Sequence, residues 1–316
     1  MTESEDLGNA GVDQGCFAIC ERSVERLVEF GINELTTYVV LAAGTGRDHS
    51  TTAWSAQAVE KYTGLRWRRA KKSIDSLYEH GFIENKSGPP KKPRYKLATP
   101  KEFIWLPKTF VVGATTEQPP LQRLRQIQDV NTMYLALWIY ANQNLVEDWG
   151  ISREWLRCDF ISHELKTWSE WRIVGFKEKR EASCNLPDPW GAHEEAPWHH
   201  MRKLIDCGLI EWTAALFEGP NGEPIHPLAH DDFSTLGDAL NRFKEAAATL
   251  IDVHEFDYVM PVPRHLRNVQ LTQIARTRYR APTDLTRQWF AEYAQAEDTY
   301  AARYEAIART IVEQAA

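Results

Sequence analysis

The chain has 316 residues, of which 43% are hydrophobic and 26% are charged, a composition typical of a folded soluble protein with two or three domains. It contains no apolar run of about 18 residues or more, which excludes a membrane-spanning helix. The formal net charge of −7 argues against a nucleic-acid-binding protein unless positive charge is concentrated in one segment.

The acidic N-terminal segment, MTESEDLGNAGVDQG, has neither the basic nor the apolar region of a signal peptide. We therefore predict a disordered leader over residues 1–16 and a cytoplasmic location. The five cysteines are odd in number and widely spaced, which argues against a disulfide framework. A zinc site would have to draw on Cys184, His193, His199, His200 and Cys207. The paired short spacings of structural zinc ligands are missing there, so we predict no metal and no cofactor.

The segment after the leader predicts two helices. Apolar residues at positions 35, 38, 39 and 42 recur at helical spacing and indicate a helix over about 33–43. Ser55 is a good N-cap for a second helix, with Trp54 and Val59 as a hydrophobic staple. That helix should end at Gly64, because glycine suits the left-handed conformation at a helix terminus.

A third helix is predicted from about Arg66 to Glu79, with an apolar face of Ala70, Ile74, Leu77 and Tyr78. Residues 82–85 and 94–97 then read as two strands joined by a Ser-Gly-Pro-Pro turn.

Positive charge is concentrated in this same segment. Residues 65–96 hold ten Lys or Arg and only three acidic residues, so the rest of the chain is strongly acidic. The candidate DNA-binding residues of the third helix are Arg66, Trp67, Arg68, Arg69, Lys71 and Lys72, and those of the hairpin are Lys86, Lys91, Lys92, Arg94 and Lys96. Clustering of one sign on a short element is typical of a phosphate-binding face.

The order helix, helix, helix, hairpin over WSAQAVEKYTGLRWRRAKKSIDSLYEHGFIE and KSGPPKKPRYKL resembles the winged helix-turn-helix family. The resemblance implies that the third helix enters the major groove of double-stranded DNA, where Arg66, Arg68 and Arg69 would read guanine. It also implies that the hairpin lies along the backbone or in the minor groove. Glu60 departs from the pattern, because many such motifs have a small residue four before the turn glycine.

A second, altered copy follows. Residues 197–211, PWHHMRKLIDCGLIE, are similar to 70–84, AKKSIDSLYEHGFIE, and residues 131–140 are similar to 35–44. Ser152 is the predicted cap of this copy's second helix, with Ile151 and Leu156 as the staple, and an insertion occupies about 157–195. Because the insertion separates the two helices of the turn, we predict a packing or oligomerisation module. The alternative is a DNA-backbone contact through Lys177, Lys179 and Arg180.

The C-terminal region is predicted to be helical over 233–250 and from about 284 to 313. The last helix carries an apolar stripe, which would pack within its own domain or form a dimer interface. Between the two helices lies a candidate second basic patch consisting of Arg264, Arg267, Arg276, Arg278 and Arg280.

These observations predict a mainly α fold with small β-hairpin wings, built as tandem winged helices followed by a C-terminal helical region. The expected domains are a leader (1–16), a DNA-reading winged helix (17–115), a second winged helix (116–230) and a helical region (231–316) that mediates dimerisation.

The function predicted is sequence-specific binding of double-stranded DNA by a homodimeric transcriptional regulator that engages no membrane. One alternative is a replication initiator that binds repeated origin sites and recruits a host protein, since tandem winged helices resemble plasmid and phage initiators. A protein-binding adaptor is the other. The sequence matches neither the phosphate-binding glycine loops nor the zinc-protease and hydrolase motifs, and it lacks the His-x-x-Arg spacing of tyrosine recombinases. We therefore predict no catalytic residues and do not expect the protein to be an enzyme.

Overall fold

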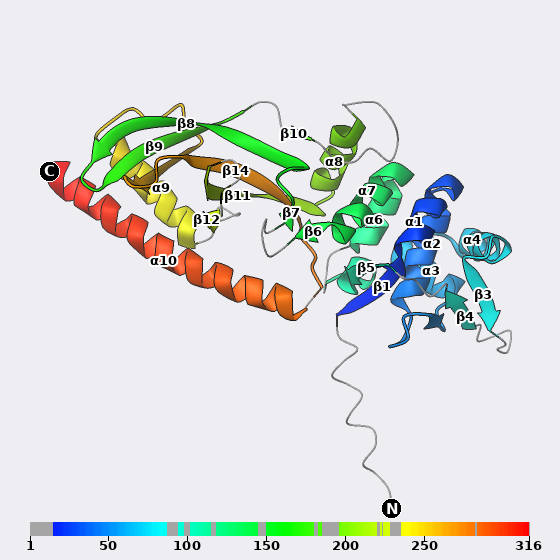
Figure 1. Cartoon of the computed structure of the whole chain (residues 1–316). Coiled ribbons are helices and arrows are strands. Elements are labelled where there is room, and N and C mark those ends of the chain that lie inside the picture. Colours follow the sequence, from blue (N-terminus) through cyan, green and yellow to red (C-terminus); the bar gives the residue numbers. More distant parts are fainter. Residues whose placement is uncertain are drawn as a thin grey trace, which may run out of the picture. The chain divides into compact units, whose positions relative to one another are not determined.

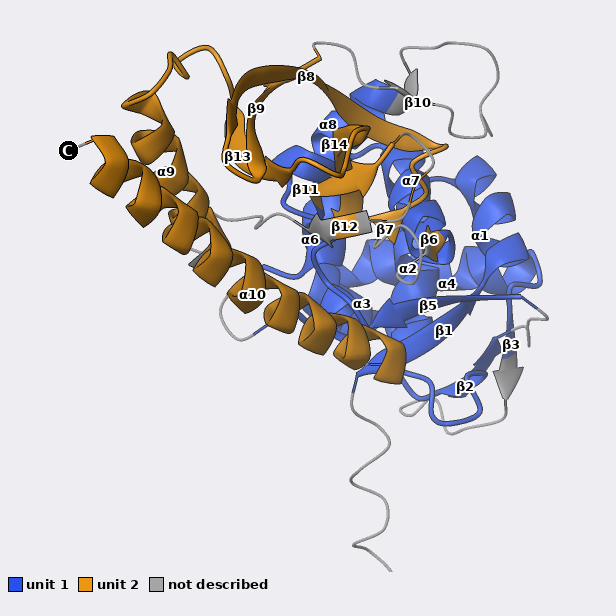
Figure 2. Ribbon diagram, turned by 60° about the vertical axis from the view of Figure 1, so that its left-hand side comes forward, with its two compact units in different colours: residues 1–142, 195–210, 277–283 blue, residues 143–194, 211–276, 284–316 orange. Residues whose placement is uncertain are grey.

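A computed structural model describes residues 15–86, 94–97, 102–114, 118–144, 150–179, 183–184, 196–219, 222, 224–227, 235–281 and 283–315. The chain divides into two compact units, coloured blue and orange in Figure 2. Unit 1 combines residues 1–142, 195–210 and 277–283, and unit 2 combines residues 143–194, 211–276 and 284–316. Both units are assembled from separate stretches of sequence, and their divisions do not coincide with the expected domain boundaries.

Unit 1 is mainly helical (Figure 1). Its helices are α1 (Glu21–Leu27), α2 (Ile32–Ala43), α3 (Ala56–Thr63), α4 (Trp67–Glu79), α5 (Thr109–Val112), α6 (Pro120–Ile127), α7 (Val130–Ala141) and α8 (Ala196–Asp206), with a 3-10 turn η1 (Val28–Phe30). Its strands are β1 (Cys16–Cys20), β2 (Thr51–Thr52), β3 (Ile83–Lys86), β4 (Arg94–Leu97) and β5 (Phe103–Pro107). Antiparallel β1 and β5 form one ribbon, and β2, β4 and β3 form a small sheet in that order.

The three helices and the hairpin predicted for this segment are confirmed as α2, α3, α4 and β3–β4. Helix α2 is buried along nearly its whole length and contacts both α3 and α4. The hairpin gains a third strand, since Thr51 and Thr52 of β2 pair with Lys96 and Tyr95 of β4.

Unit 2 contains an antiparallel sheet that curls around its core (Figure 1). Seven strands join in the order β12-β11-β14-β8-β9-β13, with β10 paired to β8. Its strands are β8 (Leu156–Trp168), β9 (Trp171–Glu178), β10 (Ser183–Cys184), β11 (Ile210–Glu218), β12 (Pro224–Pro227), β13 (Tyr258–Pro263) and β14 (Val269–Thr277). Two short strands, β6 (Gln143–Asn144) and β7 (Gly150–Ile151), form a separate pair, and the helices are α9 (Thr235–Ala248) and α10 (Asp284–Ala315).

Helices α9 and α10 pack against each other, and both contact β13. Phe176 and Met260 of the sheet lie in one core cluster with Tyr304 of α10, and Phe243 of α9 lies in a second cluster with Ile307 and Ile311. The predicted helices of the C-terminal region are therefore confirmed, and the later part of the apolar stripe on α10 packs inside unit 2. At the other end of that stripe, Leu285 is 47% exposed.

The predicted fold class is wrong, because the long strands of this sheet make the protein α+β. The helix expected after Ser152 is also wrong: residues 152–155 form a turn, and β8 begins at Leu156. The presumed insertion contains the long strands β8 and β9. The wing that a second winged helix requires corresponds to the hairpin β11–β12, but these strands belong to the large sheet. The region 231–316 contains β13 and β14 as well as helices.

Strand β8 forms a hairpin with β9, but its place in the sheet also depends on a distant partner. Its partners include β14, with Thr272 opposite Asp159, so the ladder joins segments more than a hundred residues apart. Residues 161–164 of β8 are exposed, which breaks the alternation of buried and exposed residues expected of a half-covered strand.

Candidate nucleic-acid interface

The turn between α3 and α4 follows from local sequence. The Oγ of Ser55 accepts a hydrogen bond from the backbone N–H of Gln57 at 3.4 Å, which caps the start of α3. Gly64 ends the helix with a φ of 69°, in the left-handed region predicted for it. Trp54 stacks on Tyr62 with ring centroids 4.9 Å apart, which ties the residue before the cap to the last turn of α3.

Glu60 has a role in the turn that sequence reasoning did not find. Its Oε1 accepts a hydrogen bond from the backbone N–H of Trp67 at 3.1 Å. This bond satisfies a free donor at the start of α4, where the N-cap residue Arg66 makes no side-chain capping bond. Glu60, which departs from the winged-helix pattern that the sequence resembles, therefore adds a connection between α3 and α4.

Helix α4 has a buried face and a face that is open to solvent. Ala70, Ser73, Ile74 and Leu77 are buried, and the Oγ of Ser73 donates a hydrogen bond to Glu34 of α2 at 3.1 Å. Tyr78 was expected on the buried face but is 56% exposed. Tyr78 is one residue beyond the buried Leu77, so it lies about 100° further around the helix.

The predicted recognition residues gather on the open face. Arg66, Trp67, Arg68, Arg69, Lys71 and Lys72 are all exposed. Trp67 is 49% exposed, so a purely core role for its indole does not apply. Lys71 forms an ion pair with Asp75 one turn further along α4, and such exposed pairs stabilise a helix by only about 0.3–0.5 kcal/mol.

The hairpin carries part of the predicted wing. Arg94 is exposed in β4, opposite Lys86 of β3 in the strand register. The Nζ of Lys96 lies 3.8 Å from Glu84, an ion pair on the surface. Lys91, Lys92 and the side chain of Lys86 lie outside the described residues.

Helix α6 contributes a basic residue that the sequence did not single out. The Nε of Arg125 donates a hydrogen bond to the carbonyl oxygen of Thr63 at 2.7 Å, at the end of α3. Partial burial lowers the pKa of Arg125, and the nearby charge of Arg69 lowers it further. The guanidinium groups of Arg125 and Arg69 therefore lie close enough to repel each other. The amphipathic sequence PLQRLRQI was the available signal, but it does not say which element α6 packs against.

The candidate second basic patch is not a single surface. Arg276 is buried, and its guanidinium lies over the ring of Trp289 at 4.6 Å. Arg264 and Arg267 are exposed near the turn between β13 and β14 in unit 2. Arg278 and Arg280 belong to unit 1. The five arginines therefore have different environments, although they are close in sequence.

The basic residues of the insertion do not form a described patch either. Lys177 of β9 lies 3.4 Å from Glu255, Lys179 is exposed, and Arg180 lies outside the described residues.

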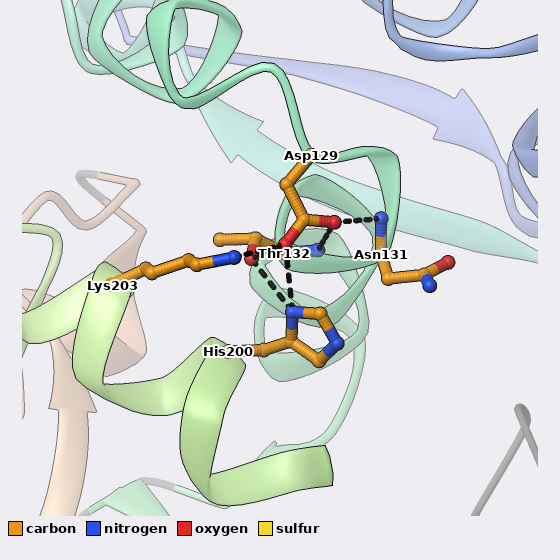
Figure 3. A network of polar contacts seen from close by, with 5 residues as sticks. All are labelled: Asp129, Asn131, Thr132, His200 and Lys203. Atoms are coloured by element: carbon orange, nitrogen blue, oxygen red, sulfur yellow. Dashed lines mark hydrogen bonds and ion pairs between the residues drawn. The ribbon is translucent and has the colours of Figure 1, made fainter.

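A polar network joins α7 to α8 in unit 1 (Figure 3). The carboxylate of Asp129 caps α7 by accepting hydrogen bonds from the backbone N–H groups of Asn131 and Thr132. From α8, the Nζ of Lys203 approaches the Asp129 Oδ2 to 2.6 Å, and the Nδ1 of His200 approaches it to 3.0 Å. The pKa of Asp129 falls well below its usual range: burial alone would raise it, but the hydrogen bonds from Lys203 and Thr132 outweigh that effect.

His200 responds in the opposite way from an exposed histidine beside a carboxylate. Burial lowers its pKa, and the attraction of Asp129 only partly offsets that effect. A neutral ring that carries its proton on Nδ1 can donate to the Asp129 carboxylate. The network is therefore a connection between two helices, and the described residues contain no group of three His, Cys, Asp or Glu arranged to hold a metal ion.

No helix of the described chain is both long enough and apolar enough to cross a membrane. The chain matches no protein-family model, no curated protein and no solved structure in the three comparisons made with known proteins.

Proposed function

We propose that this protein binds double-stranded DNA at specific sequences through α4 of unit 1. The observation that carries the proposal is the distribution of residues around this helix. One face is buried against unit 1, and the opposite face presents arginines and lysines to solvent from the first turn onward. A helix held in this way can enter the major groove, which admits one α-helix, without unfolding its own core.

The order of elements supports the same proposal. Helix α2, strand β2, helices α3 and α4 and the hairpin β3–β4 follow one another along the chain in the order typical of a winged helix. In this arrangement Arg66, Arg68 and Arg69 at the start of α4 would donate paired hydrogen bonds to guanine O6 and N7. Trp67 would contact a thymine methyl group or the sugar edge.

Phosphate contacts would come from residues around this reading face. Lys71 and Lys72 lie further along α4, Arg94 lies in the hairpin, and Arg125 is fixed beside the turn. Such contacts set the register on the duplex and provide salt-dependent affinity, whereas base contacts select the sequence. The acidic remainder of the chain would disfavour DNA binding elsewhere on the surface and so orient the protein on the duplex.

The test is a selection of genomic fragments by the purified full-length protein at about physiological ionic strength, followed by titration of the enriched site. Arg68→Ala/Arg69→Ala should abolish the preference for that site while weak general binding remains. Arg287→Ala/Arg309→Ala is the matched control, because it removes two exposed arginines from α10 in the other unit. If the Arg68→Ala/Arg69→Ala protein kept the wild-type preference for the enriched site, the proposal that α4 reads the DNA sequence would be overturned.

The same selection addresses the biological role, which we propose is transcriptional regulation. A regulator should enrich one or two sites upstream of a gene. Enrichment of an array of direct repeats next to A·T-rich DNA would instead favour a replication initiator. No enrichment by the wild-type protein would overturn site-specific recognition altogether.

A further inference from the structure

Unit 2 contains a pocket at one end of its sheet, where the turn between β8 and β9 meets the turn after β13 and the middle of α10. It is open to solvent, has a volume of about 500 Å³ and is lined by Glu170, Trp171, Pro263, Arg264, His265 and Arg303. A smaller hollow of about 230 Å³ shares four of these residues and extends to Tyr300. The larger volume lies within the range of small-molecule and nucleotide sites.

Backbone contacts fix the walls of this pocket. Trp171 pairs with Pro263 across strands β9 and β13. The backbone N–H of Arg264 donates to the carbonyl oxygen of Glu170 at 3.0 Å, and that of Leu266 donates to Pro263 at 3.1 Å. The pocket is therefore largely formed before any ligand arrives, which reduces the entropic cost of binding.

The charge in the pocket is not balanced. The guanidinium of Arg303 lies 5.9 Å from the ring centre of Trp171 and 5.5 Å from that of Tyr300. Within the part of the chain that the structure describes, neither Arg303 nor Arg264 forms an ion pair, and Glu170 is the one acid that lines the pocket. The neighbouring Arg172 is engaged differently, since its Nη1 lies 3.1 Å from Glu164.

Two guanidinium groups and an indole line the same pocket, a combination that suits a ligand with both a phosphate and a flat ring. A guanidinium fork matches the oxygens of a phosphate group. Arg303 contacts two aromatic rings and, among the described residues, forms no ion pair with a carboxylate. An aromatic wall favours a flat ring on the same ligand, because a nucleobase can stack on an aromatic side chain.

We propose that this pocket binds a nucleotide, with its phosphate on Arg264 and Arg303 and its base against the wall formed by Trp171, Pro263 and His265. The ligand can be one nucleotide of a single DNA strand or a free nucleotide, because both present the same phosphate and ring. This site lies in a different unit from α4, so it does not depend on the duplex-binding surface.

The experiment uses the full-length protein and two probes: a short fluorescein-labelled oligothymidylate, followed by fluorescence anisotropy, and thymidine monophosphate, followed by calorimetry. Arg264→Ala/Arg303→Ala should weaken binding of whichever probe binds by roughly tenfold or more. Arg287→Ala/Arg309→Ala, two exposed arginines on α10 outside the pocket, should leave it unchanged. A thermal melt of each variant shows whether the fold is retained.

Binding of the oligonucleotide but not of the mononucleotide would identify a single strand as the ligand, and comparable binding of both would identify a free nucleotide as sufficient. Equal affinities for the pocket variant and the control, or no binding of either probe by the wild-type protein, would overturn the proposal. The Arg68→Ala/Arg69→Ala variant separates the two sites, because it should lose duplex preference and keep the nucleotide affinity.

Discussion

Three residues of the α3 segment satisfy backbone groups or relieve strain, two of them locally and one across the turn to α4. Ser55 caps α3, Gly64 adopts the left-handed conformation, and Glu60 reaches the first N–H of α4. A displacement of α4 would move its exposed arginines, so under the proposed function the precision of DNA reading would depend on these small contacts.

Glu60→Ala removes the acceptor for the N–H of Trp67 and should lower the free energy of unfolding by about 1 kcal/mol, as expected for the loss of a helix cap. Glu60→Gln keeps an oxygen acceptor and should lose less than half of that amount. Urea denaturation of both variants measures the difference. Glu79→Ala, at the exposed end of α4, is the control. Equal losses in the two Glu60 variants would show that the hydrogen bond does not stabilise the turn.

The residues that sequence reasoning found and those it missed differ in the range of their interactions. Ser55 and Gly64 could be predicted because their effects are local. Glu60 acts seven residues away through a turn, and Arg125 acts 62 residues away on the carbonyl of Thr63, so no local pattern reveals them. Burial of Arg276 in β14 was equally hidden, because its arginine-rich surroundings resemble an exposed basic segment.

At the scale of elements, helices with a local apolar period were predictable, whereas the sheet of unit 2 was not. The periodicity of α4, α9 and α10 is visible within each helix. Strand β8 pairs with its neighbour β9 and with the distant β14, and β14 lies between β8 and β11. The burial pattern of these strands depends on what the curled sheet encloses. The prediction of a second winged helix was wrong for this reason. The similarity of residues 197–211, around α8, to residues 70–84 says nothing about the long strands that precede α8.

The contact between β9 and the segment after α9 depends on a glycine. A Cβ on Gly175 would lie 2.6 Å from the ring of Phe256, which is buried in the core between sheet and helices. Gly175→Ala should therefore lower the free energy of unfolding by about 1–3 kcal/mol through overpacking. Gly46→Ala is the control, because its Cβ would meet nothing closer than 3.9 Å. Adding Phe256→Leu to Gly175→Ala should recover part of the loss, and strictly additive effects in the denaturation curves would contradict the contact.

The connection between α7 and α8 should make the stability of unit 1 dependent on pH. His200 has a lowered pKa, so its contribution is complete above its ordinary value of 6.5 and is lost as the pH falls through the lowered value. Asp129 also has a lowered pKa, and its contribution is complete above 3.8 and is lost at more acidic pH. Acidification should therefore destabilise the wild-type protein in two successive pH ranges, the first set by His200 and the second by Asp129.

His200→Gln should abolish the loss of stability in the upper of these two pH ranges and leave the loss in the lower pH range. Asp129→Asn should lower the free energy of unfolding at neutral pH by about 1–3 kcal/mol, because Lys203 then lacks its carboxylate. Urea denaturation as a function of pH measures both effects. His199→Gln, at the exposed neighbouring histidine, controls for loss of a ring from α8. A His200→Gln protein with the wild-type pH profile would contradict the assignment of the upper range.

At the scale of the whole molecule, the uneven distribution of charge is the property on which the proposed DNA binding rests. The chain as a whole carries a charge of −7, yet the segment that contains α4 and the hairpin is strongly basic. Composition alone would have argued against DNA binding, whereas the position of the charges on one exposed helical face argues for it. For a protein of this kind, association with DNA should weaken steeply with salt, because every neutralised phosphate releases counterions.

This dependence separates the residues that contact phosphate from those that read bases. Arg94 is exposed in the hairpin, and Arg94→Ala should reduce affinity for all duplexes by a similar factor and reduce the slope of log K against log salt by about 1. Arg68→Ala/Arg69→Ala should instead remove most of the difference between the selected site and a scrambled duplex. Anisotropy titrations of both duplexes over a series of salt concentrations measure the two quantities, with Arg287→Ala/Arg309→Ala as the control. If Arg94→Ala changed the preference and left the slope unaltered, the hairpin would be reading bases, and the division of labour between hairpin and helix proposed above would have to be reversed.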